Sequence, residues 1–507
     1  MKNIYKSSLS VLIAGALILS CDGIEDSLVN DRLEENPVAT VEANAGSADF
    51  SNYVAIGNSL TAGFMDAALY SSGQANSLGA LLASQFAYTV DGDYTFVQPD
   101  INSVNGYNTS LNTGTGTVFG RFKLDTNIPG PSPTINGEAI GAYTGPSVNN
   151  FGVPGIVVGQ LLIPATGGPA SPANPAYSPF YERFASAPGT STIIGDVIAA
   201  DPTFFSLWIG SNDVLGYAVG GAANEAILTS TVDFETQYNA VISSLMNNTT
   251  ADGVVANIPF FLGLAYFQAV PYNAIPMDAA TAGAVNAGYA DYNNGLTAAV
   301  GGMLITQEEA DRRTINFEAS AGNAFVMEDE SLTDLSGLGL PNLRQSEPTD
   351  LVVLGAASVL GQDLGSGAVG VQAAAGDNLV LTPEEQFVIE ASRQTFNGII
   401  GSIVAANSDR IAYYDAGATT SVFYDLFGLS DGVPGITVDG VDLTPDFAPT
   451  GVLSTDGVHP NARGYGILAN EFLSEIEFKF GAIFPGVNVL DLPSVTVCGV
   501  GDCASEQ

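Results

Sequence analysis

YVAIGNSLTAGF, from Tyr53 to Phe64, is the stretch that decides the fold of this chain. Four residues that favour β structure run into Gly57-Asn58-Ser59, and a helix-forming segment follows at once. A strand, a tight turn and a helix start would place the Ser59 hydroxyl in a crevice beside unpaired backbone N–H groups. A nucleophilic serine needs those surroundings, although Gly-Asn-Ser is also ordinary turn chemistry.

Further apolar runs repeat this alternation of strand and helix. TFFSLWIG (203–210) and GVVANIPFF (253–261) are predicted as buried strands, with a helix over Phe234–Met246 between them. RIAYYD (410–415) is a third strand, and Trp208 within the first run is expected in the core. Alternating strands and helices predict an α/β fold with a mostly parallel sheet.

Two later segments carry clear helix signals. Thr382-Pro383-Glu384-Glu385 predicts a capped start for a helix that runs to about Ala406. STDGVHPNARGYGILANEFLSEI (454–476) predicts a loop and then a helix opened by Pro460, with Tyr465, Leu468, Phe472 and Ile476 on its buried face. Long insertions are expected at about 87–147 and 262–380, and the acidic loop Glu328–Glu330 in the second is expected to be solvated surface.

The charge balance excludes one class of partner. Thirteen Lys and Arg stand against 53 Asp and Glu, giving a net charge of -40, so a nucleic acid is not expected to bind. Because 46% of the residues are hydrophobic and only 13% are charged, the composition predicts a folded chain rather than a disordered one.

The amino terminus predicts export. Lys2 and Lys6 precede an apolar run from Leu9 to Ser20, as in a signal peptide, and an uncleaved anchor is the less favoured alternative. The run ends in Ile18-Leu19-Ser20-Cys21, which resembles a bacterial lipobox whose cysteine is lipidated. We therefore expect a signal peptide at 1–20, an acidic flexible tether at 21–48, and attachment to a membrane, most simply the outer membrane, through Cys21.

Two cysteines remain near the carboxyl terminus, within the expected tail at 486–507. Cys498 and Cys503 lie in CGVGDC and could close a small disulfide loop in an oxidising compartment. A metal site is less favoured, since two cysteines without a neighbouring histidine supply too few ligands.

The chain contains one histidine, His459. Asp456 lies three residues before it, close enough to accept a hydrogen bond from Nδ1 and leave Nε2 facing a serine. A lone histidine is usually structural. If an imidazole activates any serine of this chain, however, His459 must be that base.

Four blocks together resemble the GDSL or SGNH family of esterases and lipases. They occur in the order of the family and frame a domain expected at 49–485: Gly57–Leu60 (GNSL), Asn150–Gly155 (NFGVPG), Gly210–Asp213 (GSND) and Asp456–His459 (DGVH). The resemblance implies a three-layer α/β/α sandwich with a flavodoxin-like sheet. It also implies Ser59 as nucleophile, His459 as base, Asp456 as its partner, and an oxyanion hole of the Ser59 N–H, the Gly155 N–H and the Asn212 amide. One departure is Asn58, where the family has Asp.

These residues predict a serine ester hydrolase, of the carboxylesterase or lipase type, that needs no metal or organic cofactor. Its ester could be a small molecule, a lipid or an acylated glycan, and the sequence identifies no protein partner. Two alternatives stay open. The same triad could pass the acyl group to an alcohol, or the chain could be a catalytically weak surface protein that binds glycans or lipids.

Overall fold

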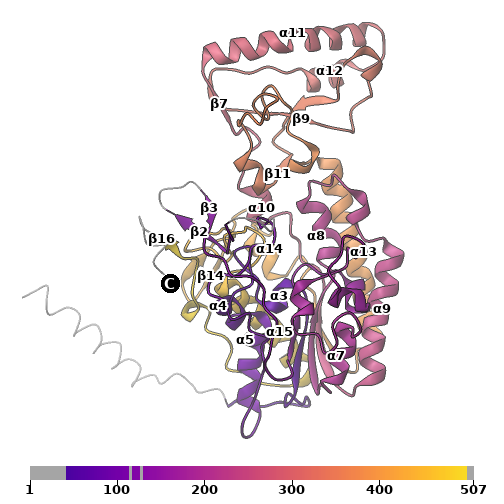
Figure 1. The fold of residues 1–507 in the computed structure, drawn as a ribbon, viewed down its shortest axis with the longest axis vertical. Coiled ribbons are helices and arrows are strands. Elements are labelled where there is room, and N and C mark those ends of the chain that lie inside the picture. The colour runs from indigo at the N-terminus through magenta and orange to yellow at the C-terminus, as the bar shows by residue number, and fades with distance from the viewer. Residues whose placement is uncertain (1–41, 113–116, 126–129, 499–507) are drawn as a thin grey trace, which may run out of the picture.

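The computed structural model describes residues 42–112, 117–125 and 130–498, and its centre is a five-stranded parallel sheet (Figure 1). Neighbouring strands follow the order β4-β1-β5-β6-β13, and each adjacent pair is parallel. Numbered along the chain this is the 2-1-3-4-5 order of flavodoxin-like sheets. The predicted α/β class and sheet type are confirmed. The strands are β1 (Tyr53–Gly57), β4 (Asn150–Gly152), β5 (Phe204–Trp208), β6 (Asp252–Ala256) and β13 (Ile411–Tyr414).

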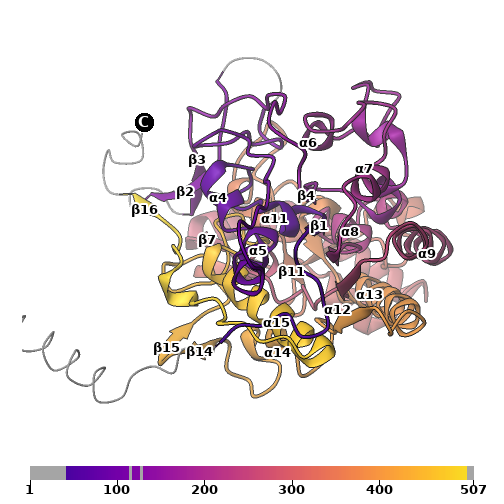
Figure 2. The ribbon, with the colours of Figure 1, turned by 90° about the horizontal axis from the view of Figure 1, so that it is seen from below.

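Helices cover both faces of the sheet because alternate strand residues point to opposite sides. Tyr53 and Ala55 of β1 pack in one core cluster, and Val54 and Ile56 pack in the other. Burying a side chain such as Ile56 contributes about 1.5–3 kcal/mol, so both faces stabilise the sheet. One face carries α5 (Leu78–Phe86) and α15 (Ala462–Phe480), and the opposite face carries α7 (Ile193–Ala199), α8 (Asn212–Val219), α9 (Thr231–Asn248) and α13 (Pro383–Ala405) (Figure 2).

Helix starts largely follow the predicted signals. The Glu385 carboxylate accepts the N–H of Thr382 at 2.7 Å, and the Thr382 hydroxyl accepts the N–H of Glu385, so the predicted cap of α13 is confirmed. The last helix does not begin at Pro460. It begins at Ala462, because the Asn461 side chain accepts the Gly464 N–H at 3.1 Å and caps it.

One predicted strand is shorter than expected. β6 ends at Ala256, whereas the apolar run continues to Phe261. After the sheet, the N–H of Ile258 donates to the Asn397 side chain instead of a neighbouring strand, and Pro259 to Phe261 line a pocket. An apolar run does not by itself distinguish a strand from a pocket wall.

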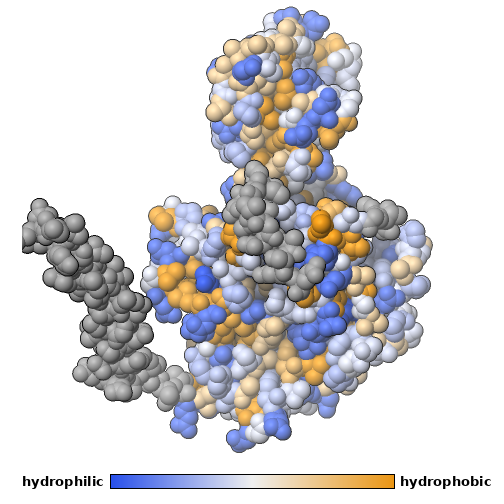
Figure 3. Space-filling view, turned by 60° about the vertical axis from the view of Figure 1, so that its left-hand side comes forward, coloured by the Kyte–Doolittle hydropathy of each residue, from blue (hydrophilic) through white to orange (hydrophobic). Residues whose placement is uncertain are grey.

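The chain from about 270 to 375 forms an upper lobe above the sheet (Figure 1). In space-filling view the lobe is a rounded mass joined to the body by a narrower neck (Figure 3). Its elements are β7 (Ile275–Met277), α11 (Ala279–Gly301), α12 (Gln307–Arg313), β8 (Ser320–Asn323), β9 (Val326–Glu328), β10 (Leu343–Gln345) and β11 (Leu351–Val352), and β11 pairs with β12 (Val380–Leu381). Within the lobe, the 361–375 loop packs against β9 and α11.

The expectation that the whole acidic loop is solvated is wrong for its middle residue. Asp329 has no exposed surface and pairs with the equally buried guanidinium of Arg344. Arg344 also pairs with Asp350 at 2.6 Å, so two carboxylates satisfy one buried cation. Breaking such a buried pair from one side typically costs about 3–5 kcal/mol.

The other insertions form short elements around the carboxyl ends of the strands. β2 (Phe122–Asp125), β3 (Pro131–Pro133) and β16 (Val497–Cys498) make a small sheet. A third elaboration, unexpected from the sequence, lies between β13 and the 454–459 loop and holds α14 (Val422–Leu426), β14 (Ile436–Val438) and β15 (Val441–Leu443). The remaining short helices are α3 (Ser59–Ala62), α4 (Ser71–Ala75), α6 (Pro179–Glu182) and α10 (Ala265–Gln268).

Within the described ranges, no helix combines the length and apolar character that crossing a membrane requires. The predicted signal peptide, the lipidation residue Cys21 and Cys503 lie outside the described residues, so the expected anchor and disulfide stay predictions.

Candidate active site

The candidate site lies where the order of the strands reverses. Ser59 follows β1, and Asn212 follows the adjacent strand β5. The chain leaves these two strands in opposite directions across the sheet, which opens a crevice at their carboxyl ends. The sheet topology therefore brings two of the predicted site residues to one place.

Ser59 is the first residue of α3, and its side chain is largely buried, with 6% of the residue exposed. The side chain of Asn58 accepts the N–H of Leu60 at 3.1 Å and caps this short helix. An aspartate could accept the same hydrogen bond. Asn58 thus preserves the local turn that holds the serine.

The Asp456–His459 pair forms as the spacing predicts. Nδ1 of His459 lies 2.9 Å from Oδ2 of Asp456, while Oδ1 of Asp456 accepts the backbone N–H groups of Val458 and His459. Burial alone would raise the pKa of Asp456, but the imidazole charge and these hydrogen bonds outweigh it and lower the pKa to about 2. An ionised carboxylate at Nδ1 fixes the tautomer in which Nε2 is the free base.

Ser59, Asn212 and His459 all line one pocket. Among the described residues, no hydrogen bond joins the Ser59 hydroxyl to His459. A serine–imidazole contact often tightens only when substrate binds, so this geometry keeps both residues as candidates. The His459 ring also packs against Phe64, with 5.0 Å between the ring centroids, which limits its rotation.

The predicted oxyanion donors are only partly brought together. Asn212 lines the pocket and donates one amide hydrogen to the Ile156 carbonyl at 2.9 Å, which leaves the second amide hydrogen available. Gly155 lies just before Ile156 with a φ of 80° and open space around it, but it is exposed and does not line the pocket. The Asn212 bond therefore ties the Gly155 turn to the pocket wall.

Asp213 is the last residue of the Gly210–Asp213 block, and the sequence pattern assigned it no role. In the structure it is a buried hydrogen-bond acceptor next to Asn212. Its carboxylate accepts the Val158 N–H at 3.0 Å and the Thr229 hydroxyl at 2.8 Å. Burial outweighs these bonds and raises the pKa of Asp213 to about 7. Asp213 joins the start of α8 to the chain that follows Gly155.

Sequence reasoning also missed the turn at Asp66 and Ala67. Both residues have positive φ, 54° and 59°, and the Ala67 N–H donates to Oδ2 of Asp456 at 2.9 Å. Asp66 Oδ1 accepts two hydrogen bonds from Thr455. No local pattern indicates this turn, since its partners lie nearly 400 residues away.

The pocket beside Ser59 is apolar. It encloses about 830 Å³, counting the part open to solvent, and its walls come from the ends of β5 and β6, the 452–468 region and the third elaboration. No described residue of the 87–147 insertion lines it, so the described part of that insertion does not form a wall of this pocket. Its apolar walls include Leu215, Phe260, Phe423, Leu426, Phe427 and Ile436.

Comparison with known proteins adds little to this geometry. A scan against protein-family models found no match, and a search of curated proteins found none either. Among solved structures, the chain is similar to a catalytic mutant of Axe2, an acetylxylan esterase from Geobacillus stearothermophilus. The two share 12% sequence identity with a TM-score of 0.27, over 66% of this chain and 73% of that one. At that TM-score the similarity assigns neither a family nor an activity to this chain.

Proposed function

We propose that this protein is a serine ester hydrolase with Ser59 as nucleophile and His459 as general base. The observation that carries the proposal is that His459, which lines the same pocket as Ser59, is hydrogen-bonded through Nδ1 to the ionised Asp456. That arrangement leaves Nε2 free to accept a proton from a serine hydroxyl.

In the proposed reaction, Ser59 Oγ attacks the ester carbonyl as its proton passes to His459 Nε2. The tetrahedral intermediate collapses to an acyl-enzyme, and the alcohol leaves with the proton from the imidazolium. Water, deprotonated by His459, then releases the carboxylic acid and restores the serine. The Asn212 amide would stabilise the negative oxygen in both steps, and the backbone N–H groups of Ser59 and Gly155 are the proposed further donors.

The pocket supports an ester with an apolar acyl chain. Apolar walls favour an alkyl chain, since each buried CH₂ contributes about 0.8 kcal/mol. A short acetyl group would leave most of these walls unused. We therefore favour medium or longer acyl chains over acetate.

Two serines, Ser59 and Ser211, line the pocket, and they allow a direct test. The purified protein would be assayed on p-nitrophenyl esters from acetate to decanoate and labelled with a fluorophosphonate. Ser59→Ala should abolish turnover and labelling, whereas Ser211→Ala should still be labelled. Ser402→Ala, on the exposed side of α13, is the control for effects of substitution and purification that do not involve the pocket.

Equal slow rates in the wild type and Ser59→Ala, with no label on Ser59, would refute the proposal and favour the catalytically weak binding protein. Product analysis with an added alcohol separates hydrolysis from acyl transfer, since only transfer yields a new ester.

We also propose that the chain is exported and anchored through Cys21. The support is the basic start, apolar run and lipobox-like end of the first 21 residues. In a bacterial host, labelled palmitate should be incorporated into the wild type but not into Cys21→Ser. Incorporation into both would place the lipid elsewhere.

A further inference from the structure

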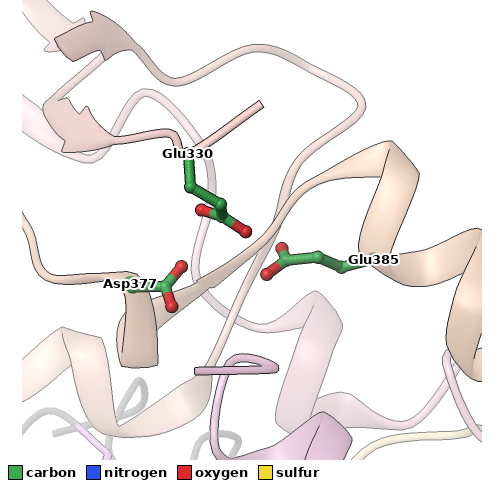
Figure 4. Close-up of side chains that lie close together, drawn as sticks. All are labelled: Glu330, Asp377 and Glu385. Atoms are coloured by element: carbon green, nitrogen blue, oxygen red, sulfur yellow. The ribbon is translucent and has the colours of Figure 1, made fainter. Parts of the chain in front are cut away.

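We propose that Glu330, Asp377 and Glu385 form a Ca²⁺ site at the neck between the upper lobe and the body. Each carboxylate offers one oxygen, and the three oxygens lie within 4.8 Å of one another. Figure 4 shows the side chains converging from three separate segments. Glu330 follows β9, Asp377 lies just before β12, and Glu385 lies in the first turn of α13.

The buried member of the cluster points to a ligand. Glu385 is only 7% exposed, and its Oε2 is used by the cap of α13, accepting the Thr382 N–H and hydroxyl. Its Oε1 is also buried but has no hydrogen-bond partner within the described part of the chain. An unpartnered carboxylate oxygen is costly unless something binds it. In Figure 4 the Glu385 carboxylate faces the other two.

Charge supports the same conclusion. Three carboxylates meet in the cluster, and no ion pair in the described part of the chain joins any of them to a lysine or arginine, so the cluster lacks a compensating positive charge. A bound cation would supply that charge. The arginines of the lobe are paired with other carboxylates: Arg344 with Asp329 and Asp350, Arg312 with Glu347, and Arg313 with Glu309.

The donor set selects among cations. Three carboxylates with no nitrogen or sulfur donor suit a hard ion. Ca²⁺ binds oxygens at about 2.3–2.6 Å, so ligands on opposite sides of one ion can be about 4.6–5.2 Å apart. Mg²⁺ demands a tighter octahedron, with opposite oxygens about 4.2 Å apart at most. Separations of up to 4.8 Å lie within the span of a single Ca²⁺, whose flexible coordination geometry accepts them.

Space for water ligands is present on the solvent side. A hollow of about 910 Å³, counting the part open to solvent, is lined by Glu330 and Asp377 together with Tyr217 of α8 and Glu225. Glu385 approaches from the buried side and Glu330 from the exposed side. An ion held here would contact the lobe, the neck and α13 at once, and would stiffen the junction.

The neck is connected to the candidate active site. The carbonyl of Asp377 lies so close to Gly221, just after α8, that a Cβ added there would sit 2.4 Å from it. Tyr266 of α10 donates its N–H to Gly457, two residues before His459, at 2.9 Å. A cation that orders the neck would thus stabilise two elements next to the pocket.

Calorimetric titration and thermal unfolding test the site without relying on activity. The purified protein would be stripped with EDTA and titrated with CaCl₂ or MgCl₂ near neutral pH. We expect one Ca²⁺ per chain with a Kd of about 10⁻⁵–10⁻³ M and at least tenfold weaker Mg²⁺ binding. Millimolar Ca²⁺ should raise the Tm by about 1–3 °C, because the shift per unit of binding free energy is small in a chain of this length.

Glu385→Gln is the decisive variant because glutamine can keep the helix cap while losing the charge. It should weaken Ca²⁺ binding more than tenfold and remove the Tm shift, and Glu330→Gln, at an exposed position, should do the same without disturbing the fold. Glu225→Gln, in the same hollow but outside the cluster, is the matched control and should bind normally. No saturable binding by the wild type, or equal losses in Glu225→Gln and Glu330→Gln, would overturn the proposal.

Discussion

Oδ1 of Asp66 accepts hydrogen bonds from both the backbone N–H and the hydroxyl of Thr455, at 2.9 and 2.7 Å. Thr455 precedes Asp456, and Asp66 lies seven residues after Ser59, so this contact joins the two halves of the proposed triad. Each of these hydrogen bonds contributes about 1 kcal/mol.

Asp66→Ala should therefore lower kcat more than tenfold with a smaller change in KM, since a shift of about 1 Å in catalytic geometry can cost 100-fold. Tyr70→Phe is the matched variant, because it removes the hydrogen bond to Asp66 Oδ2 and keeps both bonds to Thr455. Its loss should be clearly smaller in steady-state assays of a p-nitrophenyl ester. Equal losses would mean that Asp66 acts only through general stability.

Asn212→Ala should reduce kcat by about 100- to 1000-fold, the usual cost of one lost oxyanion donor. Its amide also holds the Ile156 carbonyl, so the Gly155 turn would loosen as well. Asn224→Ala, at an exposed position beyond the other end of α8, serves as the control. A twofold effect in Asn212→Ala would remove this residue from the proposed oxyanion hole.

Activity should rise as the pH increases from the acid range to neutral, because a histidine must be neutral to act as general base. Asp456, with its pKa lowered to about 2, is ionised throughout this range and adds no second ascending step. The measurement is kcat/KM against pH for the wild type. A flat profile would count against His459 as the base.

Asp213 should make the stability of the protein fall as pH rises from about 4 to 7. Its pKa is raised in the folded state from 3.8 to about 7, so its contribution is full below pH 4 and is lost as the pH passes 7. The free-energy change is on the order of several kcal/mol at most.

Asp213→Asn isolates this effect, since the asparagine oxygen can accept the Val158 N–H while its amide donates to Thr229. The Tm of the wild type minus that of Asp213→Asn should decrease between pH 4 and 8. A constant difference would show that Asp213 does not change protonation in that range.

The third elaboration should set the acyl-chain preference, because Ile436 of β14 lines the pocket. Ile436→Trp should lower the ratio of kcat/KM for octanoate to kcat/KM for acetate by about tenfold. The bulkier side chain would keep about two CH₂ groups of the acyl chain from being buried in the pocket. Ile135→Trp, exposed in the 87–147 insertion, is the control. An unchanged ratio would place the acyl chain elsewhere.

Much of the fold follows from local patterns. The buried strands around Val54, Phe205 and Val255 are apolar runs of strand length, and their alternation with helices predicts a parallel sheet. The Asp456–His459 contact was also predictable, because two residues three positions apart in one turn lie close together whatever the fold of the rest of the chain. Trp208 is buried as expected.

The sequence by itself therefore determined the sheet, the turn that presents Ser59 and the pairing of its one histidine. Only the tertiary structure decided what surrounds them: the contact between Asp66 and Thr455, the pocket wall from the third elaboration, and the meeting of Glu330, Asp377 and Glu385. The sequence spacing between two residues determines whether they meet when both lie in one turn or one strand. Contacts between distant loops depend on the path of irregular chain, which carries no periodicity, and on the packing of the sheet that brings the loop ends together.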